Sequence, residues 1–117
     1  MDMNELARLG VCWQEGVRRC AGHAELYEKF LFRFPDDPTF GRLREAMAAE
    51  DWEEAFLQAH TLKGVAGNLS LNGLYQQLTP FVEQLRESRD LPGAKAAFPA
   101  LCQNCEELIE VLCRLRG

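Results

Sequence analysis

Apolar residues recur at three- and four-residue steps along most of the chain, the spacing of one face of an α-helix. The clearest stretches are 24–34 with a continuation after Thr39, then 52–69, 74–86 and 92–115. Two shorter stretches, 4–9 and 13–20, precede them and end at Gly10 and at Ala21–Gly22. No segment shows the sustained alternation of a β-strand. The pattern therefore predicts an all-α protein, an antiparallel four-helix bundle with short extra N-terminal helices.

Residues that begin, end or bend helices mark the expected boundaries. Thr39 and Asp51 are each expected to cap the amino terminus of the helix that follows. Asn72–Gly73 is expected to lie between two helices. Pro80 and Pro99 fall inside helical patterns, where proline removes a backbone donor. We therefore expect a kink at Pro80, and a kink or a restart at Pro99.

Length and composition limit the class of protein. The 117 residues suffice for one core, so we expect a single domain over residues 1–117. The net charge is −5, so the protein lacks the positive field that would attract nucleic acid or anionic lipid. Neither is therefore an expected partner. No apolar run approaches the roughly 18 residues of a membrane helix. Asp2 and Glu5 stand where a secretory signal would be basic, so the sequence predicts a cytoplasmic protein. We also expect the protein to be a monomer.

Five cysteines are an odd number in a chain that can build a core without disulfides, which favours reduced thiols. Cys102 and Cys105 form a CxxC pair, a spacing that zinc sites and thiol-exchange proteins use. A structural zinc needs four ligands, and Cys12 and Cys20 fall at irregular separations from this pair. We therefore expect no metal, and small apolar thiols buried on helix faces.

Segment 52–69 sorts its side chains onto two sides when it is wound at about 100° per residue. The side expected in the core carries Ala55, Ala59, Leu62, Val65, Ala66 and Leu69. The opposite side carries Glu53, Phe56, Leu57, His60, Lys63, Gly64 and Gly67. A glycine inside a helix costs about 1 kcal/mol relative to alanine, so two of them on one face indicate a constraint other than folding.

His60 is the candidate reactive residue of this face. Gly64 lies one turn later and Gly67 continues the gap, so a partner backbone or a phosphoryl group could approach the imidazole. Lys63, three residues after His60, places an ammonium near any group attached to the ring. Exposed apolar area for a docking protein is expected one turn before the histidine, at Phe56 and Leu57.

The stretch from His60 to Leu69, HTLKGVAGNL, resembles the signature of histidine-containing phosphotransfer (HPt) domains of bacterial two-component phosphorelays, in which H-x-L-K-G-x-A-x-N-L surrounds the phosphorylated histidine. Residues 15–22 and 25–34 are similar to the helices that precede this site in the family. Ser70 departs from the family, which usually has glycine after Asn-Leu, and it falls at the helix end. Val65, often serine or alanine in relatives, falls near the core edge.

The resemblance implies a phosphate carrier with no kinase or phosphatase activity of its own. A receiver domain of a response regulator or a hybrid sensor kinase would donate a phosphoryl group from its aspartate to His60, which would pass it to another receiver. Lys63 would offset part of the phosphoryl charge. The receiver would supply the acidic pocket and Mg²⁺, so no cofactor is expected on this chain.

Two other functions remain open. The chain could be an adaptor that docks on a kinase or receiver without turnover, although inactive relatives would be expected to lose the histidine that here accompanies Lys63. It could also be a helical metal or thiol-redox protein that uses Cys102 and Cys105. The second histidine, His23, lies next to Gly22 without a lysine or glycine on a common face, and we expect it only to begin a helix.

Overall fold

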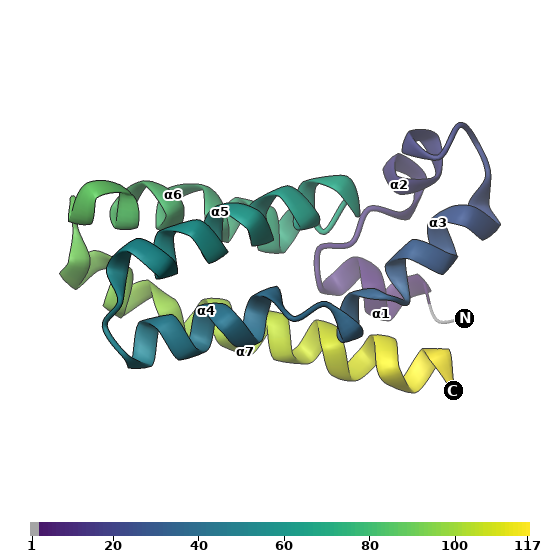
Figure 1. The fold of residues 1–117 in the computed structure, drawn as a ribbon. Coiled ribbons are helices and arrows are strands. Elements are labelled where there is room, and N and C mark those ends of the chain that lie inside the picture. Colours follow the sequence, from purple (N-terminus) through teal and green to yellow (C-terminus); the bar gives the residue numbers. More distant parts are fainter. Residues whose placement is uncertain (1–2) are drawn as a thin grey trace.

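The structure, a computed structural model, describes residues 3–117 and is built from helices (Figure 1). In chain order they are α1 (Met3–Arg8), α2 (Trp13–Arg19), α3 (Ala24–Leu31), the 3-10 turn η1 (Phe34–Asp36), α4 (Thr39–Ala48), α5 (Trp52–Asn68), α6 (Asn72–Leu85), the 3-10 turn η2 (Arg86–Ser88) and α7 (Leu91–Arg116). The described part of the chain contains no strand beyond one isolated bridge. None of its helices combines the length and the apolar composition that crossing a bilayer requires. The predicted all-α class is confirmed.

The bundle consists of α4, α5, α6 and α7, each packed against the next in the chain (Figure 1). Short connections between them make sequential helices antiparallel neighbours. The first and last helices of the bundle are joined by an ion pair, in which Arg44 Nη1 lies 3.1 Å from Glu106 Oε1. The predicted bundle with short extra N-terminal helices is confirmed.

The last helix is longer than the bundle needs. Its 26 residues span about 39 Å at 1.5 Å per residue, and the longest dimension of the molecule is 40 Å. Its carboxyl-terminal turns therefore pass beyond the bundle to α1 and the end of α3 (Figure 1). There Arg114 pairs with Glu5, and Arg116 Nη1 donates to the carbonyl oxygen of Phe32 at 3.1 Å and to Asp36 Oδ2 at 3.0 Å.

Helix starts were predicted with mixed success. Asp51 is the N-cap of α5, as expected, and its side chain accepts a hydrogen bond from the Glu54 amide at 3.2 Å. The prediction for Thr39 is wrong, because Thr39 is buried and already helical while the Asp37 carboxylate accepts its N–H at 2.8 Å. The helix expected over 24–34 ends at Leu31, and residues 34–36 form η1 instead.

Two expected helix boundaries after α5 are also corrected. Asn72 begins α6 rather than preceding it, and α7 runs through Pro99 without a restart. Pro80 and Pro99 both face solvent, and so do Gln76 and Lys95, four residues before each of them. The carbonyls that lose their hydrogen bond to each proline can therefore be hydrated, which lowers the cost of keeping the helix continuous.

The segment between α1 and α2 pairs with the segment between α5 and α6. The Cys12 amide donates to the Ser70 carbonyl at 3.0 Å, and the Gly73 amide donates to the Gly10 carbonyl at 3.2 Å. Gly10 has φ +83°, and a Cβ on it would lie 2.6 Å from the Gly73 nitrogen, so both the backbone conformation and the close approach require glycine there. This pairing seats α2 against the carboxyl end of α5.

The contact between α2 and α3 is fixed by one aromatic ring. Tyr27 is buried, and its hydroxyl donates to the Leu69 carbonyl at 2.6 Å. Gly16 of α2 lies against this ring so closely that a Cβ on it would overlap the ring atoms. Trp13 meets the same ring edge-on, with centroids 5.1 Å apart. The two short helices are therefore positioned by side-chain packing as well as by the backbone pairing.

Candidate functional site: a hollow beside His60

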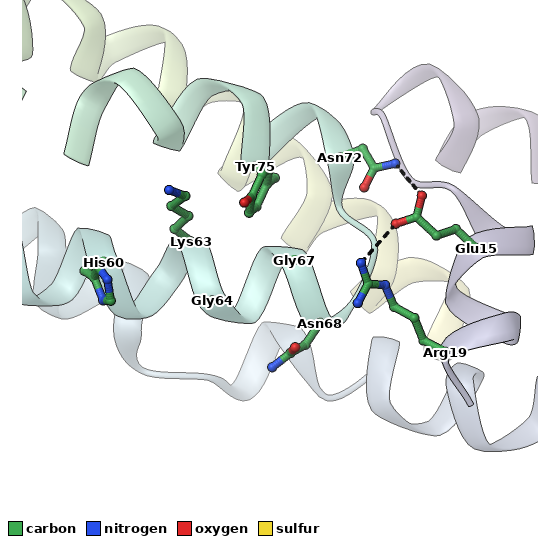
Figure 2. A pocket seen from close by; sticks show the side chains of 9 residues that line it. All are labelled: Glu15, Arg19, His60, Lys63, Gly64, Gly67, Asn68, Asn72 and Tyr75. Atoms are coloured by element: carbon green, nitrogen blue, oxygen red, sulfur yellow. Dashed lines mark hydrogen bonds and ion pairs between the residues drawn. The ribbon is translucent and has the colours of Figure 1, made fainter. Parts of the chain in front are cut away.

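A surface hollow of about 490 Å³ lies along the outer face of α5 (Figure 2). We call it the His60 hollow, and its lining consists of Glu15, Arg19, His60, Lys63, Gly64, Gly67, Asn68, Asn72 and Tyr75. These residues come from α2, α5 and the first turn of α6. Sequence reasoning predicted a functional role for His60, Lys63, Gly64 and Gly67 and for none of the other five. The predicted residues are therefore brought together, and α2 and α6 complete the hollow.

His60 is exposed in the middle of α5. Within the described residues, neither ring nitrogen makes a hydrogen bond, and the nearest ring is Phe56, with centroids 6.0 Å apart. One turn on, a Cβ built on Gly64 would meet no heavy atom within 4 Å. The open approach to the imidazole that the sequence predicted at Gly64 is confirmed.

The predicted gap at Gly67 is wrong, because the ring of Tyr75 occupies it. A Cβ on Gly67 would lie 3.3 Å from Tyr75 Cε2, closer than most side chains tolerate. The Lys63 ammonium lies 5.5 Å from the centroid of the same ring, a cation–π distance. Tyr75 therefore fills the space that Gly67 leaves and supports Lys63. The only feature of the sequence that pointed to this contact was Gly67 itself, because the space beside a glycine can be filled by a side chain from a neighbouring helix as well as by a partner.

The two apolar residues expected on the outer face differ. Leu57 is 51% exposed, as predicted. Phe56 is only half-buried and packs against the core, with the Arg86 guanidinium 4.8 Å from its ring centroid. The prediction of exposed apolar area is therefore confirmed at Leu57 and wrong at Phe56. Neither residue lines the His60 hollow.

Glu15 of α2 ties the hollow to the turn between α5 and α6. Its carboxylate accepts a hydrogen bond from Ser70 Oγ at 3.2 Å. It also accepts one from Asn72 Nδ2 at 3.2 Å and lies 3.5 Å from Arg19 Nη2 (Figure 2). The hydrogen bond from Asn72 is the main reason that the pKa of Glu15 is lowered, with Ser70 and Arg19 adding to it.

Ser70 combines full burial with φ +55°, the left-handed region that favours glycine. This conformation explains why glycine suits the position in the family pattern, because serine bears a backbone cost there that glycine does not. Its hydroxyl is hydrogen-bonded to Glu15. Ser70 is at the helix end, as predicted, and it also connects that end to α2.

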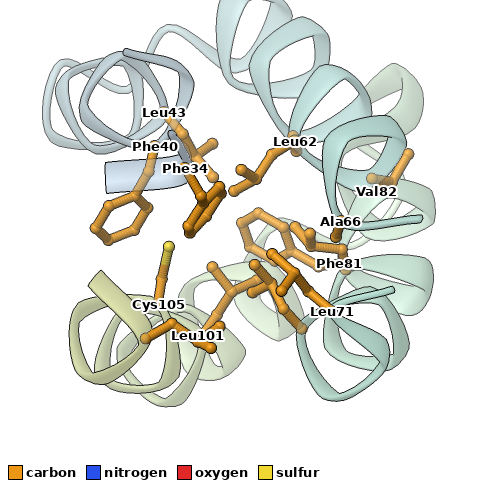
Figure 3. Packing of buried hydrophobic residues seen from close by; sticks show 14 of the residues in the cluster. Phe34, Phe40, Leu43, Leu62, Ala66, Leu71, Phe81, Val82, Leu101 and Cys105 are labelled. Carbon is orange, nitrogen blue, oxygen red and sulfur yellow. The ribbon is translucent and has the colours of Figure 1, made fainter. Parts of the chain in front are cut away.

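The opposite face of α5 forms one wall of the core (Figure 3). Ala55, Ala59, Leu62 and Ala66 are fully buried, as the sequence predicted. Val65 and Leu69 are only partly buried and lie at the edge of the cluster. Because most of these side chains are small, α4 and α6 pack closely on this face and hold the axis of α5 in place. The core thus fixes the direction in which His60 projects.

The cysteines form no second site. Cys105 is buried, which raises the pKa of its thiol to about 12, and Cys102 is half-buried with its thiol pKa also raised by burial. A raised pKa lowers the thiolate fraction on which thiol chemistry depends. Cys12 and Cys20 are half-buried at the two ends of α2, and Cys113 is exposed, so the prediction of thiols buried on helix faces is confirmed fully for Cys105 alone. Between residues 3 and 117, no group of three or more histidine, cysteine and acidic residues is placed to hold a metal.

A family model for the Hpt domain matches residues 25–115, which is most of the chain. The chain belongs to the Hpt domain family. It is therefore a histidine phosphotransfer module of phosphorelays, a class of carriers that act with receiver domains or kinases of two-component systems. A search of the curated proteins and a search of the solved structures each found no match.

The matched range shows which elements of this chain the family shares. It includes α3 to α7 almost completely and hence the HTLKGVAGNL stretch on α5. It begins after α2, so Glu15 and Arg19 precede the matched residues although they line the same hollow as His60. The resemblance drawn from the sequence over residues 15–22 lies outside the match. His23, the N-cap residue of α3, is exposed and lies outside the hollow.

Proposed function

We propose that this Hpt domain accepts a phosphoryl group on His60 from the aspartate of one receiver domain and passes it to the aspartate of another. The observation that carries the proposal is the exposed imidazole of His60, which has an open flank at Gly64 and projects from the stretch that resembles the family's phosphorylation motif. A ring nitrogen without a partner among the described residues is available as a nucleophile.

The transfer is a substitution at phosphorus. The lone pair of one imidazole nitrogen forms an N–P bond while the P–O bond to the receiver aspartate breaks, and that carboxylate leaves with the bonding electrons. In the second transfer a carboxylate of another receiver attacks, and the imidazole leaves. Mg²⁺ in the acidic pocket of the receiver would neutralise the phosphoryl oxygens, and we therefore place no cofactor on this chain.

Lys63 supplies charge from this chain. Its ammonium rests near the Tyr75 ring in the unphosphorylated domain, and a phosphoryl group on His60 offers it a stronger, charge-assisted partner. Leu57 and the open flank at Gly64 form the docking surface on either side of the histidine. Gly67 and Phe56 support this surface indirectly. Gly67 leaves room for the ring of Tyr75, and Phe56 packs beside His60.

Label transfer from a phosphorylated receiver tests the proposal. The chain should acquire an acid-labile, base-stable label, and His60→Ala should abolish it. His23→Ala is the matched control, because His23 is the only other histidine of the sequence and lies outside the hollow. A label retained by His60→Ala would refute the assignment. Binding of the receiver without any label would instead support the adaptor function.

Lys63→Ala tests the role of the ammonium. Alanine is the best helix former, so α5 should remain folded. Loss of one charge that stabilises the transferring group should slow transfer by about 100-fold, the lower end of the range for a single transition-state hydrogen-bond donor. An unchanged rate would show that Lys63 is only a surface charge on the Tyr75 ring.

A further inference from the structure

We propose that Arg19 of α2 is a specificity-determining residue, which binds an acidic side chain of the receiver that docks over His60. The proposal rests on the proposed function, since it assigns a second contact to the same docking partner. It goes beyond that function because it places receiver recognition on the N-terminal helices, outside the phosphorylation motif.

Arg19 lines the same hollow as His60, so a receiver that docks over this hollow meets both residues. His60 and Asn68 line the hollow eight residues apart on α5, which is about 12 Å along a helix axis. Figure 2 shows Arg19 at the Asn68 end of the hollow and His60 at the other end. A protein interface of ordinary size buries about 800 Å² per partner, a patch about 30 Å across, so a receiver centred on His60 reaches about 15 Å from it and covers the Asn68 end of the hollow, beside Arg19.

The guanidinium of Arg19 is oriented by one ion pair and remains partly exposed to solvent. Glu15 binds it at 3.5 Å, and Glu15 is itself fixed by the hydrogen bonds from Ser70 and Asn72. The Arg19 side chain is nevertheless 51% exposed. Arginine carries five N–H donors in a planar fork, so a second carboxylate can bind its open side. Such pre-orientation reduces the entropy that a flexible surface side chain loses on binding.

The charge of the hollow also favours an acidic partner. The whole chain has a net charge of −5, but the lining of the hollow holds two cations, Lys63 and Arg19, and one carboxylate, Glu15, so its formal balance is +1 before His60 is counted. Lys63 is the cation closer to the reacting histidine along the chain. Arg19 remains available to the receiver protein.

The position of Arg19 in the chain suits discrimination rather than shared chemistry. The Hpt match begins at residue 25, whereas α2 ends at Arg19. A contact that lies outside the shared motif can differ between carriers without changing the transfer step, and selectivity needs such a difference between partners.

Charge substitution on α2 tests the proposal. Arg19→Gln removes the charge and Arg19→Glu reverses it, while Arg18→Glu is the matched control, because Arg18 is the exposed neighbour that does not line the hollow. Each variant is assayed with a phosphorylated receiver that labels the unmodified chain, and with phosphoramidate, a small donor that needs no docking. Melting temperatures are recorded on the same preparations.

We expect transfer from the receiver to fall about two- to fivefold in Arg19→Gln, the range of one exposed ion pair, and further in Arg19→Glu. The loss should shrink towards about 1 M salt, where the screening length is about 3 Å. Labelling by phosphoramidate, and both reactions of Arg18→Glu, should not change. Because Arg19→Glu places two acidic groups one turn apart, Arg19→Gln decides the outcome if the reversed variant melts early.

The failures of the two proposals are distinguishable. If phosphoramidate and the receiver both leave His60 unlabelled in the unmodified chain, the proposed function is wrong. If labelling is normal and Arg19→Gln and Arg19→Glu accept phosphate from the receiver at the unmodified rate, Arg19 does not contact the receiver. An equal loss in Arg18→Glu would also overturn the inference, since the effect would then follow from net charge alone.

Discussion

Substitution of Gly64 by glutamine separates space needed for docking from space needed for folding. A Cβ at Gly64 meets no heavy atom within 4 Å, so a longer side chain can leave the helix surface without strain. Glutamine is more favourable than glycine in a helix interior by about 0.7 kcal/mol. For a domain of this size, that gain should raise the melting temperature by about 3 °C.

Phosphoryl transfer should change in the opposite direction. The new side chain stands one turn from His60 in the hollow that the receiver has to enter. Reacting atoms must come within about 3–3.5 Å, and a misplacement of about 1 Å costs on the order of 100-fold in rate. We therefore expect Gly64→Gln to transfer phosphate at least about 100-fold more slowly than the unmodified protein, although it is more stable. The transfer rate of Gly64→Ala should lie between those of the two proteins.

Melting by circular dichroism and the rate of label transfer are measured on the same preparation. Gly41→Gln is the matched control. Gly41 is an exposed glycine of α4 where a Cβ also meets nothing within 4 Å, and it lies outside the His60 hollow. Because Gly41 is in the first turn of its helix, its stability gain should be smaller than that at Gly64. Its transfer rate should not change.

Three outcomes would refute the reasoning at different points. A Gly64→Gln protein that is stable and fully active would show that receivers do not approach along this flank. A variant that melts below the unmodified protein would show that Gly64 serves the fold. An equal loss of transfer in Gly41→Gln would show that the rate responds to added bulk anywhere on the bundle.

Three further predictions concern stability and reactivity. Gly16→Ala should destabilise the protein by about 1–3 kcal/mol in urea unfolding, because the new methyl group overlaps the ring of Tyr27, which is held by its own hydrogen bond; an unchanged urea midpoint would contradict this packing. The pKa of Glu15 is lowered in the folded state, so its contribution to stability is present above its ordinary value near 4.3 and is lost as the pH falls through the folded value. As the pH is lowered, the urea midpoint of Glu15→Gln should therefore fall less steeply than that of the unmodified protein. Identical slopes would argue against the hydrogen bonds from Ser70 and Asn72 to Glu15. Iodoacetamide at mildly alkaline pH should alkylate exposed Cys113 long before buried Cys105, whose pKa is about 12, and mass spectrometry showing equal rates would refute that burial.

Features confined to one helix were predictable from the sequence. Burial of Ala55, Ala59, Leu62 and Ala66 and exposure of His60 follow from the period of a single helix, and the structure confirms them. Thr39 was mistaken for a cap because Asp37, two residues earlier, is also a capping type, and sequence patterns place helix ends only to within about two residues.

Features that depend on two segments were not predictable in the same way. The ring that fills the space at Gly67 comes from Tyr75 on the next helix, and Glu15 meets Ser70 across 55 positions of the chain. No local period encodes such contacts, because they depend on how the helices are placed relative to one another. The sequence therefore predicted the exposed histidine that lines the hollow, whereas it did not predict the residues that α2 and α6 contribute to the lining.

The length of α7 has a consequence for how the molecule unfolds. One continuous helix packs against α6 in the bundle and against α1 beyond it, and its last turn holds the end of α3 through Arg116. Elements joined in this way tend to exchange their amide hydrogens as one cooperative unit rather than separately. Deletion of that last turn should therefore speed exchange in α1 to α3, and the shape of the far end of the His60 hollow then depends on residues at the opposite terminus that never approach it.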